Sequence, residues 1–498
     1  MALPRILVTG ASGFIGRHLL EVLKENYEVI GLGRRSQLRC GAPFHENISW
    51  HQVDIGDTAT MDRVFGEIQA AGQVDFVIHL AAHYDFTGDD HPEYERTNIH
   101  GLRTVLDRCR DLKPRCFIFS SSLAACAFPD AGSVLTEKSP PDGDHIYARS
   151  KARGEAMLAE YSDSFPSFIV RFAALFSDWC EYPPLYMFLR TWLSRAWNSR
   201  ILGGKGYSAI PYLHIKDATS FLLQILRRNA DLKGGEVLIA SPDGAIRHND
   251  LYKTSTEYFF EDHKSPIHTP KFLVKPGILF RCFMGRFSSE KPFEKPWMAK
   301  YVDLQLAVDA SHTRKRLGWA PKQRREIMYR LPFLIENRKF DRIEWMRRNR
   351  AAMKSVRVRP NLVIHNLLQK HKETIIQEST IALRTRFPSY QGLDDRDHRW
   401  NHSLILGNLF NAIRTRMKPE FMSYCRNLGE RRLEEGFDVD EVIGALETIN
   451  TICIQTLMKD KDAEEMRPYF FAAITMTIRF GIDQVQDAFD RVQEEGGF

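Results

Sequence analysis

Short apolar runs alternate with amphipathic stretches over the first half of the chain. The apolar runs lie at residues 6–9, 27–35, 48–55, 74–82 and 116–119, and apolar residues at helical spacing follow at 18–24, 61–71, 93–110 and 155–160. Short runs bounded by turn residues predict buried strands, and strands that alternate with helices predict a parallel sheet covered on both faces. The pattern therefore predicts an α/β fold with a doubly wound Rossmann sheet.

The last part of the chain shows only the helical pattern. Apolar residues at helical spacing run through residues 362–387, 397–417, 419–436, 438–458 and 463–493. Helices joined by short loops predict an all-α bundle. We therefore expect three parts: residues 1–340 with the sheet and a small substrate subdomain (mainly 173–210 and 240–335), a basic linker at 341–361, and a helical bundle domain at 362–498.

Three glycines stand between the first predicted strand and the helix that follows it. Gly10, Gly13 and Gly16 have G-x-x-G-x-x-G spacing directly after the apolar run. Such a turn lets the backbone approach a pyrophosphate closely, and the helix N-terminus offers it unpaired N–H groups. The turn therefore predicts a dinucleotide site to which we expect these residues to contribute: Gly10, Ser12, Gly13, Phe14, Ile15 and Gly16.

The end of the second predicted strand bears on which dinucleotide binds. Dinucleotide folds often place an acid here for the ribose hydroxyls. This chain has Gly33 instead, followed by Arg34 and Arg35. Guanidinium groups suit a 2′-phosphate, which favours NADP over NAD; the alternative is a solvated basic turn.

A tyrosine and a lysine lie downstream of a serine cluster. Tyr147 and Lys151 are four residues apart at a helix start, so the phenol and the ammonium share one helix face. Ser120–Ser122 follow a strand, at the end of a parallel sheet where ligands gather. A tyrosine and a lysine at this spacing are common in structural helices. The pair indicates a catalytic site here because it follows the glycine turn and the serine cluster.

Together these residues resemble the extended short-chain dehydrogenase/reductase family, which includes the epimerase/dehydratase enzymes. The matching motifs lie in order over about residues 2–335: the glycine turn, Asp54, Leu80–Ala82, Asn98, Ser120–Ser122, Tyr147 with Lys151, residues 211–218 and residues 309–321. The resemblance implies an NAD(P)-dependent hydride-transfer enzyme with a small-molecule substrate.

The resemblance also implies roles for the polar residues. Tyr147 would be the general acid/base, and Lys151 with the oxidised nicotinamide would lower the phenol pKa from about 10 towards working pH. Lys151 would also bond the nicotinamide ribose, and Ser122 would hold the substrate oxygen. Asn98 would support Lys151 through a water or a backbone contact, or be only a helix-bend residue.

Further cofactor contacts follow from the same resemblance. Asp54 would contact the adenine, with a simple turn-former as the alternative, and Ile55 lies beside it. The small residues after the fourth predicted strand would let the cofactor lie close: Leu80, Ala81 and Ala82.

The substrate motifs of the family are less complete. Leu123-Ala124 follow Ser122 where dehydratases carry Asp-Glu, and residues 171–177 lack the asparagine that helps many epimerases hold a substrate diphosphate. A nucleotide sugar is therefore doubtful from these residues. A run of aromatic residues predicts core and pocket wall, or a pocket for a bulky apolar alcohol or ketone: Phe172, Phe176, Trp179, Tyr182, Tyr186, Phe188, Trp192 and Trp197.

An apolar segment at residues 271–286 carries basic residues around it, among them Lys271, Lys275, Arg281 and Arg286. One apolar stripe with flanking charge is typical of any docked helix, so a helix of the substrate subdomain is favoured. The alternative is a helix on a membrane surface.

Composition narrows the class of protein and its surroundings. The net charge of +6 over 498 residues does not imply nucleic acid. Eight scattered cysteines, without a C-x-x-C pair or zinc spacing, indicate reduced thiols and no metal. Without a signal peptide before the first strand or a run of membrane-spanning length, we expect a cytoplasmic protein with no transmembrane segment.

The stretch at about residues 362–460 resembles the sensory helical domain at the N-terminus of stressosome-type Rsb co-antagonist proteins. The matching residues are mostly helix punctuation, such as Arg386-Phe387-Pro388 and Gly436-Phe437-Asp438. The resemblance implies signal input or dimerisation, so we expect a homodimer or a regulatory protein partner through residues 362–498. Four histidines there are expected to be satisfied surface residues rather than ligands: His365, His371, His398 and His402.

Two functions fit the whole sequence. The first is an NADP-dependent oxidoreductase or epimerase that the helical bundle regulates or dimerises. The second is a redox-sensing regulator in which the bundle passes on the state of the bound dinucleotide. Tyr147 favours the enzyme, because a pure sensor has no need of it.

Overall fold

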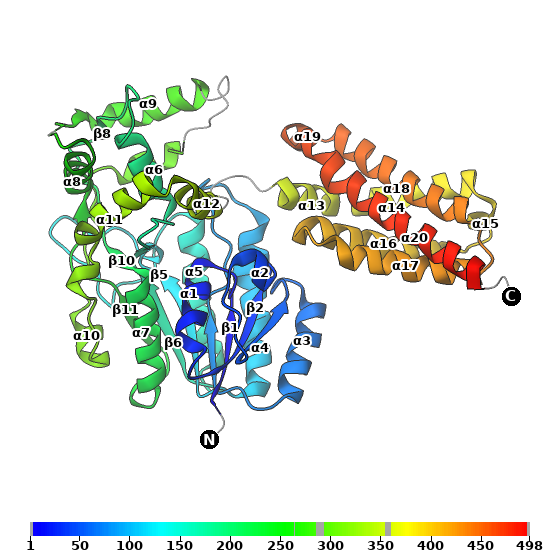
Figure 1. The fold of residues 1–498 in the computed structure, drawn as a ribbon, viewed down its shortest axis with the longest axis horizontal. Helices are drawn as coiled ribbons and strands as arrows, with labels where there is room; N and C mark the ends of the chain where they lie inside the picture. The colour runs from blue at the N-terminus through cyan, green and yellow to red at the C-terminus, as the bar shows by residue number, and fades with distance from the viewer. Residues whose placement is uncertain (1–2, 263, 285–292, 354–359, 496–498) are drawn as a thin grey trace. The chain divides into compact units, whose positions relative to one another are not determined.

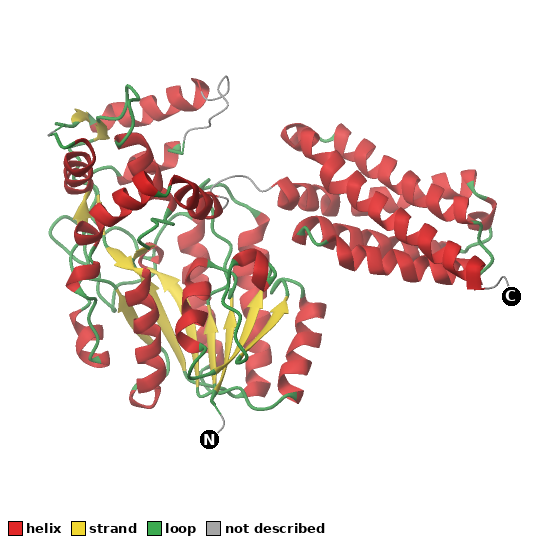
Figure 2. Ribbon diagram, in the orientation of Figure 1, coloured by secondary structure: helices red, strands yellow, loops and turns green. Residues whose placement is uncertain are grey.

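The computed structural model describes residues 3–262, 264–284, 293–353 and 360–495. The chain divides into two compact units, Met1–Arg357 and Val358–Phe498. Strands occur in the first unit, and the described part of the second is helical (Figure 2).

A seven-stranded sheet forms the centre of the first unit (Figure 1). Every pair of neighbouring strands is parallel, in the order β11–β6–β5–β4–β1–β2–β3. The strands are β1 (Arg5–Thr9), β2 (Glu28–Gly33), β3 (Ile48–Gln52), β4 (Phe76–His79), β5 (Cys116–Ser122), β6 (Ser167–Phe172) and β11 (Glu236–Ala240). The predicted doubly wound sheet is confirmed. Its strand order reverses beside β1, and ligands bind in the crevice that such a reversal leaves at the carboxyl ends of the strands.

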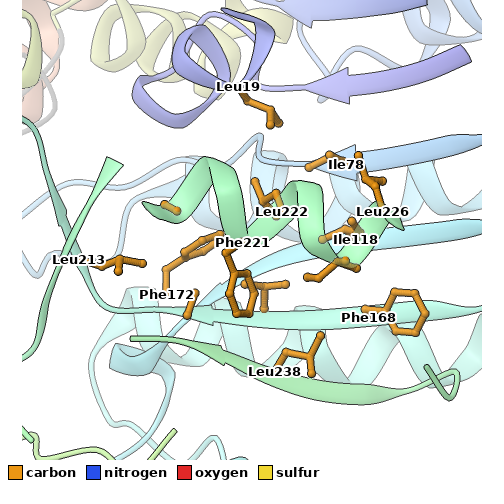
Figure 3. Close-up of a cluster of buried hydrophobic side chains, with 14 of the residues drawn as sticks. Leu19, Ile78, Ile118, Phe168, Phe172, Leu213, Phe221, Leu222, Leu226 and Leu238 are labelled. Atoms are coloured by element: carbon orange, nitrogen blue, oxygen red, sulfur yellow. The ribbon is translucent and has the colours of Figure 1, made fainter. Parts of the chain in front are cut away.

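Successive residues of β1 enter two different cores, because side chains alternate across a strand. Ile6 and Val8 join a cluster with Leu19 and Phe221, part of which Figure 3 shows, whereas Leu7 joins the cluster on the other face. The helices that supply the first cluster include α1 (Phe14–Leu23), α2 (Gln37–Cys40) and α7 (Ile215–Arg228). Those that supply the second are α3 (Thr58–Ala70), α4 (Gly101–Leu112) and α5 (Ile146–Leu158).

A smaller subdomain is built from short strand pairs and helices. The pairs are β7 (Ala174–Phe176) with β10 (Tyr212–His214), β8 (Ile201–Gly203) with β13 (Ile267–Thr269), and β9 (Ala209–Ile210) with β12 (Ile246–Arg247). The helices of this half of the unit are α6 (Pro183–Trp192), α8 (His248–Phe260), α9 (Lys271–Met284), α10 (Ser311–Leu317), α11 (Ile327–Phe340) and α12 (Arg342–Met353). A separate core joins α6, α8, α11 and α12 through Leu185, Leu251, Leu331 and Trp345.

Helix α12 occupies part of the stretch that the sequence predicts to be a basic linker. Its Trp345 and Asn349 are buried, and Arg347 and Arg348 both pair with Glu344. The described part of this stretch is thus a helix packed on the first unit. Arg286 of the apolar segment lies outside the described residues, as do three basic residues after α12: Lys354, Arg357 and Arg359.

The second unit is a bundle around one apolar core, as predicted. Its helices are α13 (Pro360–Lys370), α14 (Lys372–Arg386), α15 (Pro388–Gln391), α16 (Asp395–Thr415), α17 (Lys418–Glu434), α18 (Val439–Lys459), α19 (Arg467–Phe470) and α20 (Met476–Glu495). The helical pattern at residues 362–387 belongs to two helices. His371 takes non-helical backbone angles between them, and its Nε2 lies 2.7 Å from Oδ2 of Asp460.

The histidines of the bundle are hydrogen-bonded, but three of the four are buried rather than on the surface. His365 contacts the carbonyl of Phe410, His398 contacts the carbonyl of Tyr390, and Thr380 Oγ1 lies 3.1 Å from Nδ1 of His402. Their positions on the helices could be read from the sequence, but burial depends on how the helices pack.

Candidate active site

The glycine turn has no room for side chains. Gly10 has φ of +69°, and a Cβ on it would lie 2.6 Å from the backbone nitrogen of Ala81. A Cβ on Gly16 would lie 2.5 Å from the carbonyl oxygen of Gly10, so the helix can start this close to the strand only with glycine. Gly13 is the N-cap of α1 and provides no side-chain cap, which leaves the first-turn N–H groups available to an anion.

The residues after β4 lie beside this turn. The N–H of Leu80 donates to the carbonyl of Thr9 at 3.1 Å, and the N–H of Ala81 donates to Thr9 Oγ1 at 3.3 Å. Ala82 follows directly, so the small residues predicted near the cofactor border the crevice between β1 and β4.

Gly33 ends β2 against the glycine turn. A Cβ on Gly33 would lie 2.9 Å from Cβ of Ser12 and 3.0 Å from the Trp50 ring, so an acidic side chain cannot be added here without displacing a neighbour. The guanidinium of Arg35 donates to the carbonyl of Ser12. Within the described residues, the Arg34 guanidinium has no hydrogen bond or ion pair.

The third strand is followed by Asp54 and Ile55, both buried. Asp54 Oδ1 accepts the N–H of Gly56 at 3.0 Å and lies 3.3 Å from Nη1 of Arg96. Asp54 therefore forms a turn and an ion pair, and its contact with the adenine stays a prediction.

Ser122, Tyr147 and Lys151 come together at the carboxyl end of β5. The buried Lys151 Nζ donates to the carbonyl of Ser120 at 2.6 Å and lies 5.8 Å from the centre of the Tyr147 ring. Burial raises the pKa of the Tyr147 phenol, and a hydrogen bond with the Ser122 hydroxyl partly opposes that rise. Burial lowers the pKa of Lys151 to about 8, against the opposing effect of the Glu155 carboxylate.

Asn98 supports the same helix from a π-helical turn, Tyr94–His100. Its Oδ1 accepts the N–H of His83 at 2.6 Å, and its Nδ2 donates to the His83 carbonyl and to Ser150 Oγ. Ser150 in turn donates to the carbonyl of Tyr147. Asn98 thus links the loop after β4 to the helix that carries Tyr147 and Lys151. π-helical turns of this kind are often found at functional sites.

The first unit also matches a known protein family. The sequence model of the NAD dependent epimerase/dehydratase family matches residues 6–240. This part of the chain is therefore similar to the NAD-dependent epimerase/dehydratases.

Individual relatives match over a larger or smaller part of the chain. A dTDP-D-glucose 4,6-dehydratase of Dictyostelium discoideum is 27% identical over 275 residues, which cover 50% of this chain and 61% of the relative. The crystal structure of UDP-glucose 4-epimerase from Thermotoga maritima, with UDP-glucose, has a TM-score of 0.52 and 21% identity over 67% of this chain and 98% of that one. A dTDP-glucose 4,6-dehydratase from Bacillus anthracis, in complex with NAD, has a TM-score of 0.51 and 17% identity over 68% of this chain and 98% of that one. At these identities the two structures show the fold alone.

The first unit places a second aromatic residue, Tyr84, against Tyr147. The sequence did not single out Tyr84. The rings of Tyr84 and Tyr147 have centroids 4.1 Å apart, and Phe86 lies 4.5 Å from Tyr84. Phe86 also lies 6.5 Å from Tyr182 and 5.6 Å from Phe293. The sequence shows that Tyr84 and Phe86 are aromatic and follow Ala82 closely. Only the packing shows that Tyr84 contacts Tyr147 and that Phe86 contacts Tyr84.

The aromatic residues predicted as core or pocket wall divide between these roles. Tyr182 reaches the aromatic cluster through Phe86, whereas Phe176 and Trp192 are buried in the subdomain core. Trp197 is exposed.

The first unit also holds a buried carboxylate beside α1. Glu181 Oε1 lies 3.0 Å from Nη2 of Arg17, and Ser177 Oγ donates to Oε2 at 2.7 Å. Oδ1 of Asn349 in α12 accepts the N–H of Glu181 at 3.0 Å. Burial raises the pKa of Glu181, but a hydrogen bond with His18, the charge of Arg17 and the hydrogen bond from Ser177 together lower it to about 2. Sequence reasoning missed this cluster, because Arg17 lies 164 positions before Glu181 and Asn349 lies 168 positions after it.

Proposed function

We propose that this chain is an NAD(P)-dependent oxidoreductase or epimerase that acts on a hydroxyl or carbonyl group through Ser122, Tyr147 and Lys151. The observation that carries the proposal is the convergence of these three side chains at the carboxyl end of β5, which is separated from β1 by β4 alone. The match to the epimerase/dehydratase family supports it.

A bound nicotinamide cofactor would supply hydride-transfer chemistry at the substrate carbon. In the oxidation direction, the Tyr147 phenolate takes the hydroxyl proton and the substrate becomes a carbonyl. The ammonium of Lys151 stabilises the phenolate, and Ser122 positions the substrate oxygen by a hydrogen bond. In the reverse direction Tyr147 returns the proton.

For the cofactor the proposal is NADP rather than NAD. Gly33 leaves no space for the ribose-binding acid, and Arg34 has no hydrogen bond or ion pair among the described residues. A guanidinium free of such partners is suited to a 2′-phosphate. The Bacillus anthracis relative was solved with NAD, so the choice depends on these two residues of this chain.

For the substrate the proposal is a sugar nucleotide, because the relatives carry that specificity in their names. Leu123 and Ala124 lack the acidic groups of a dehydratase, so epimerisation or simple oxidation is favoured over dehydration. The aromatic contact of Tyr84 with Tyr147 favours a second candidate, a bulky apolar alcohol or ketone.

The second unit would serve as a regulatory or dimerisation domain, in keeping with its resemblance to stressosome sensory domains. The proposed assembly is a homodimer, with a signalling protein as a further partner.

The test is turnover on a panel of sugar nucleotides and hydroxysteroids with NADP and with NAD. A change in the redox state of the cofactor, or interconversion of sugar epimers, with any panel member supports the enzyme. Tight cofactor binding with no change on any member would instead support the redox-sensing regulator.

A further inference from the structure

The apolar side chains of α9 face away from the protein. Six of them are between 45% and 76% exposed: Phe272, Leu273, Leu279, Phe280, Phe283 and Met284. Ile278 is the buried residue of this helix. Single exposed apolar residues are ordinary, but a group of this size marks an interaction surface.

The exposed residues form one stripe. At about 100° per residue, Phe272, Leu279 and Phe280 fall on one face of the helix, and Val274 with Ile278 falls on the opposite one. The inner face is attached to the subdomain, since Arg281 pairs with Glu294 at 2.8 Å and Val274 lies beside Gly203. A surface helix normally turns its apolar stripe to the core. The favoured interpretation, a helix of the substrate subdomain, agrees with the attachment of the inner face, but most apolar side chains of the helix lie outside that attachment.

Positive charge surrounds this stripe. Lys275 lies at its edge, Lys271 lies one helical turn before it and closer to the inner face, and both are exposed. Residues 264–300 contain eight lysines and arginines against two glutamates. Basic residues beside an apolar helix face are typical of helices in the interface of anionic membranes, where long lysine stems reach the headgroups.

We propose that α9 lies in the surface of a lipid bilayer that contains anionic lipids, with Phe272, Leu279 and Phe280 among the acyl chains. The helix has 14 residues, or about 21 Å, so it is too short to cross a hydrocarbon core of about 30 Å. No helix among the described residues has the length and apolarity to span a membrane. The helix therefore lies on the membrane.

The helix leads directly to the active site. After residues 285–292 the described chain resumes at Phe293, which contacts Phe86, and Trp297 stacks on His145 at 6.0 Å. His145 lies 6.2 Å from the Tyr147 ring. Membrane binding would thus hold the aromatic residues beside Tyr147, among them Phe86 and Trp297, near the bilayer. This holds for either proposed substrate class.

The experiment is flotation of the full chain with vesicles of phosphatidylcholine alone and of phosphatidylcholine with phosphatidylglycerol. The wild type is expected to float with the anionic vesicles and to bind less at high salt. The double variant Phe272→Ser/Phe280→Ser should bind roughly tenfold less or weaker still, because two large apolar groups are lost from the interface. The matched control is Ile381→Ser on α14, which removes an exposed apolar side chain from the second unit and should float like the wild type.

Circular dichroism and thermal melting of each variant establish that it is folded. The proposal is overturned if the wild type stays unbound with both vesicle types, or if the double variant floats as well as the wild type. A further outcome is that the wild type does not float and that the molecular mass in solution is lower for the double variant than for the wild type. This result would show that a second copy of the chain covers α9, and it would equally overturn the proposal. None of these readouts uses cofactor or substrate, so they are independent of the proposed reaction.

Discussion

The ring of Tyr84 lies against the ring of Tyr147, with centroids 4.1 Å apart and planes inclined by 37°. Tyr84 belongs to the loop after β4, and Tyr147 to the first turn of α5. The proposed acid/base is therefore held from the side by a second phenol whose own pKa burial raises well above its usual value. Lys151 and Ser122, the groups that would stabilise a phenolate, contact Tyr147. We therefore assign Tyr84 a positioning role.

Shortening Tyr84 should change substrate binding more than proton transfer. Tyr84→Ala removes an aromatic contact of about 0.5–1.5 kcal/mol, so kcat/KM should fall by roughly twofold to tenfold, mainly through KM. Tyr84→Phe keeps the ring and should stay within about twofold of the wild type. Steady-state kinetics on the best panel substrate measure both, and a Tyr84→Phe enzyme as slow as Tyr147→Phe would show that the Tyr84 hydroxyl takes part in the chemistry.

The cofactor preference depends on Arg34. Arg34→Ala should weaken NADP binding by roughly tenfold to a hundredfold, because one charge-assisted contact with the 2′-phosphate is lost, and leave NAD binding unchanged. Arg35→Ala is the comparison: its guanidinium contacts the Ser12 carbonyl, so both dinucleotides should weaken together. Calorimetric titration of each variant with each cofactor gives the result. Equal NADP affinity of wild type and Arg34→Ala would exclude this role.

Lys151 should leave a signature in the pH dependence of stability. Its pKa is lowered from 10.5 to about 8, so between these values the unfolded chain binds more protons than the folded one. The free energy of unfolding of the wild type should therefore rise with pH, relative to Lys151→Met, from about pH 8 to pH 10.5. Below pH 8 the difference should be constant. Urea unfolding of the two proteins without cofactor across this range provides the comparison, and a flat difference throughout would mean that Lys151 is not desolvated.

Glu181 should stabilise the first unit at neutral pH. Glu181→Gln breaks a buried ion pair with Arg17, which predicts a loss of roughly 3 kcal/mol. Because the pKa of Glu181 is lowered from 4.5 to about 2, the stabilisation is present above pH 4.5 and disappears as the pH falls through this range.

The exposed Glu160 offers a matched substitution for that experiment. Glu160 pairs with Arg103 at the surface, where solvent screens the charges, so Glu160→Gln should change the free energy of unfolding far less than Glu181→Gln. Denaturant unfolding at pH 7 and at acid pH separates the two. If both variants lost the same small amount of unfolding free energy, the Glu181 cluster would not stabilise the first unit.

The sequence predicted the features that depend on local geometry. The positive φ of Gly10 and the four-residue spacing of Tyr147 and Lys151 are constraints within a few residues, so the turn and the shared helix face could be foreseen. Strand alternation likewise led to the sheet, although β6 and β11 were not foreseen as separate strands.

Features that depend on long-range packing were missed. The contact of Tyr84 with Tyr147 joins residues that are far apart in sequence, as does the ion pair of Arg17 with Glu181. The stripe on α9 shows a further limit: periodicity reveals that apolar residues share a face, but not whether that face meets the core or the outside. The roles of the individual site residues towards cofactor and substrate stay predictions.

Proton transfer by Tyr147 is tested most directly by a single-turnover experiment with NADP and the best panel substrate. The absorbance of the reduced nicotinamide should appear or disappear in the wild type, and Tyr147→Phe should bind the cofactor equally well but react roughly a hundredfold to ten-thousandfold more slowly. A Tyr147→Phe protein that changes the redox state of its cofactor at the wild-type rate would contradict the assignment of Tyr147 as the acid/base.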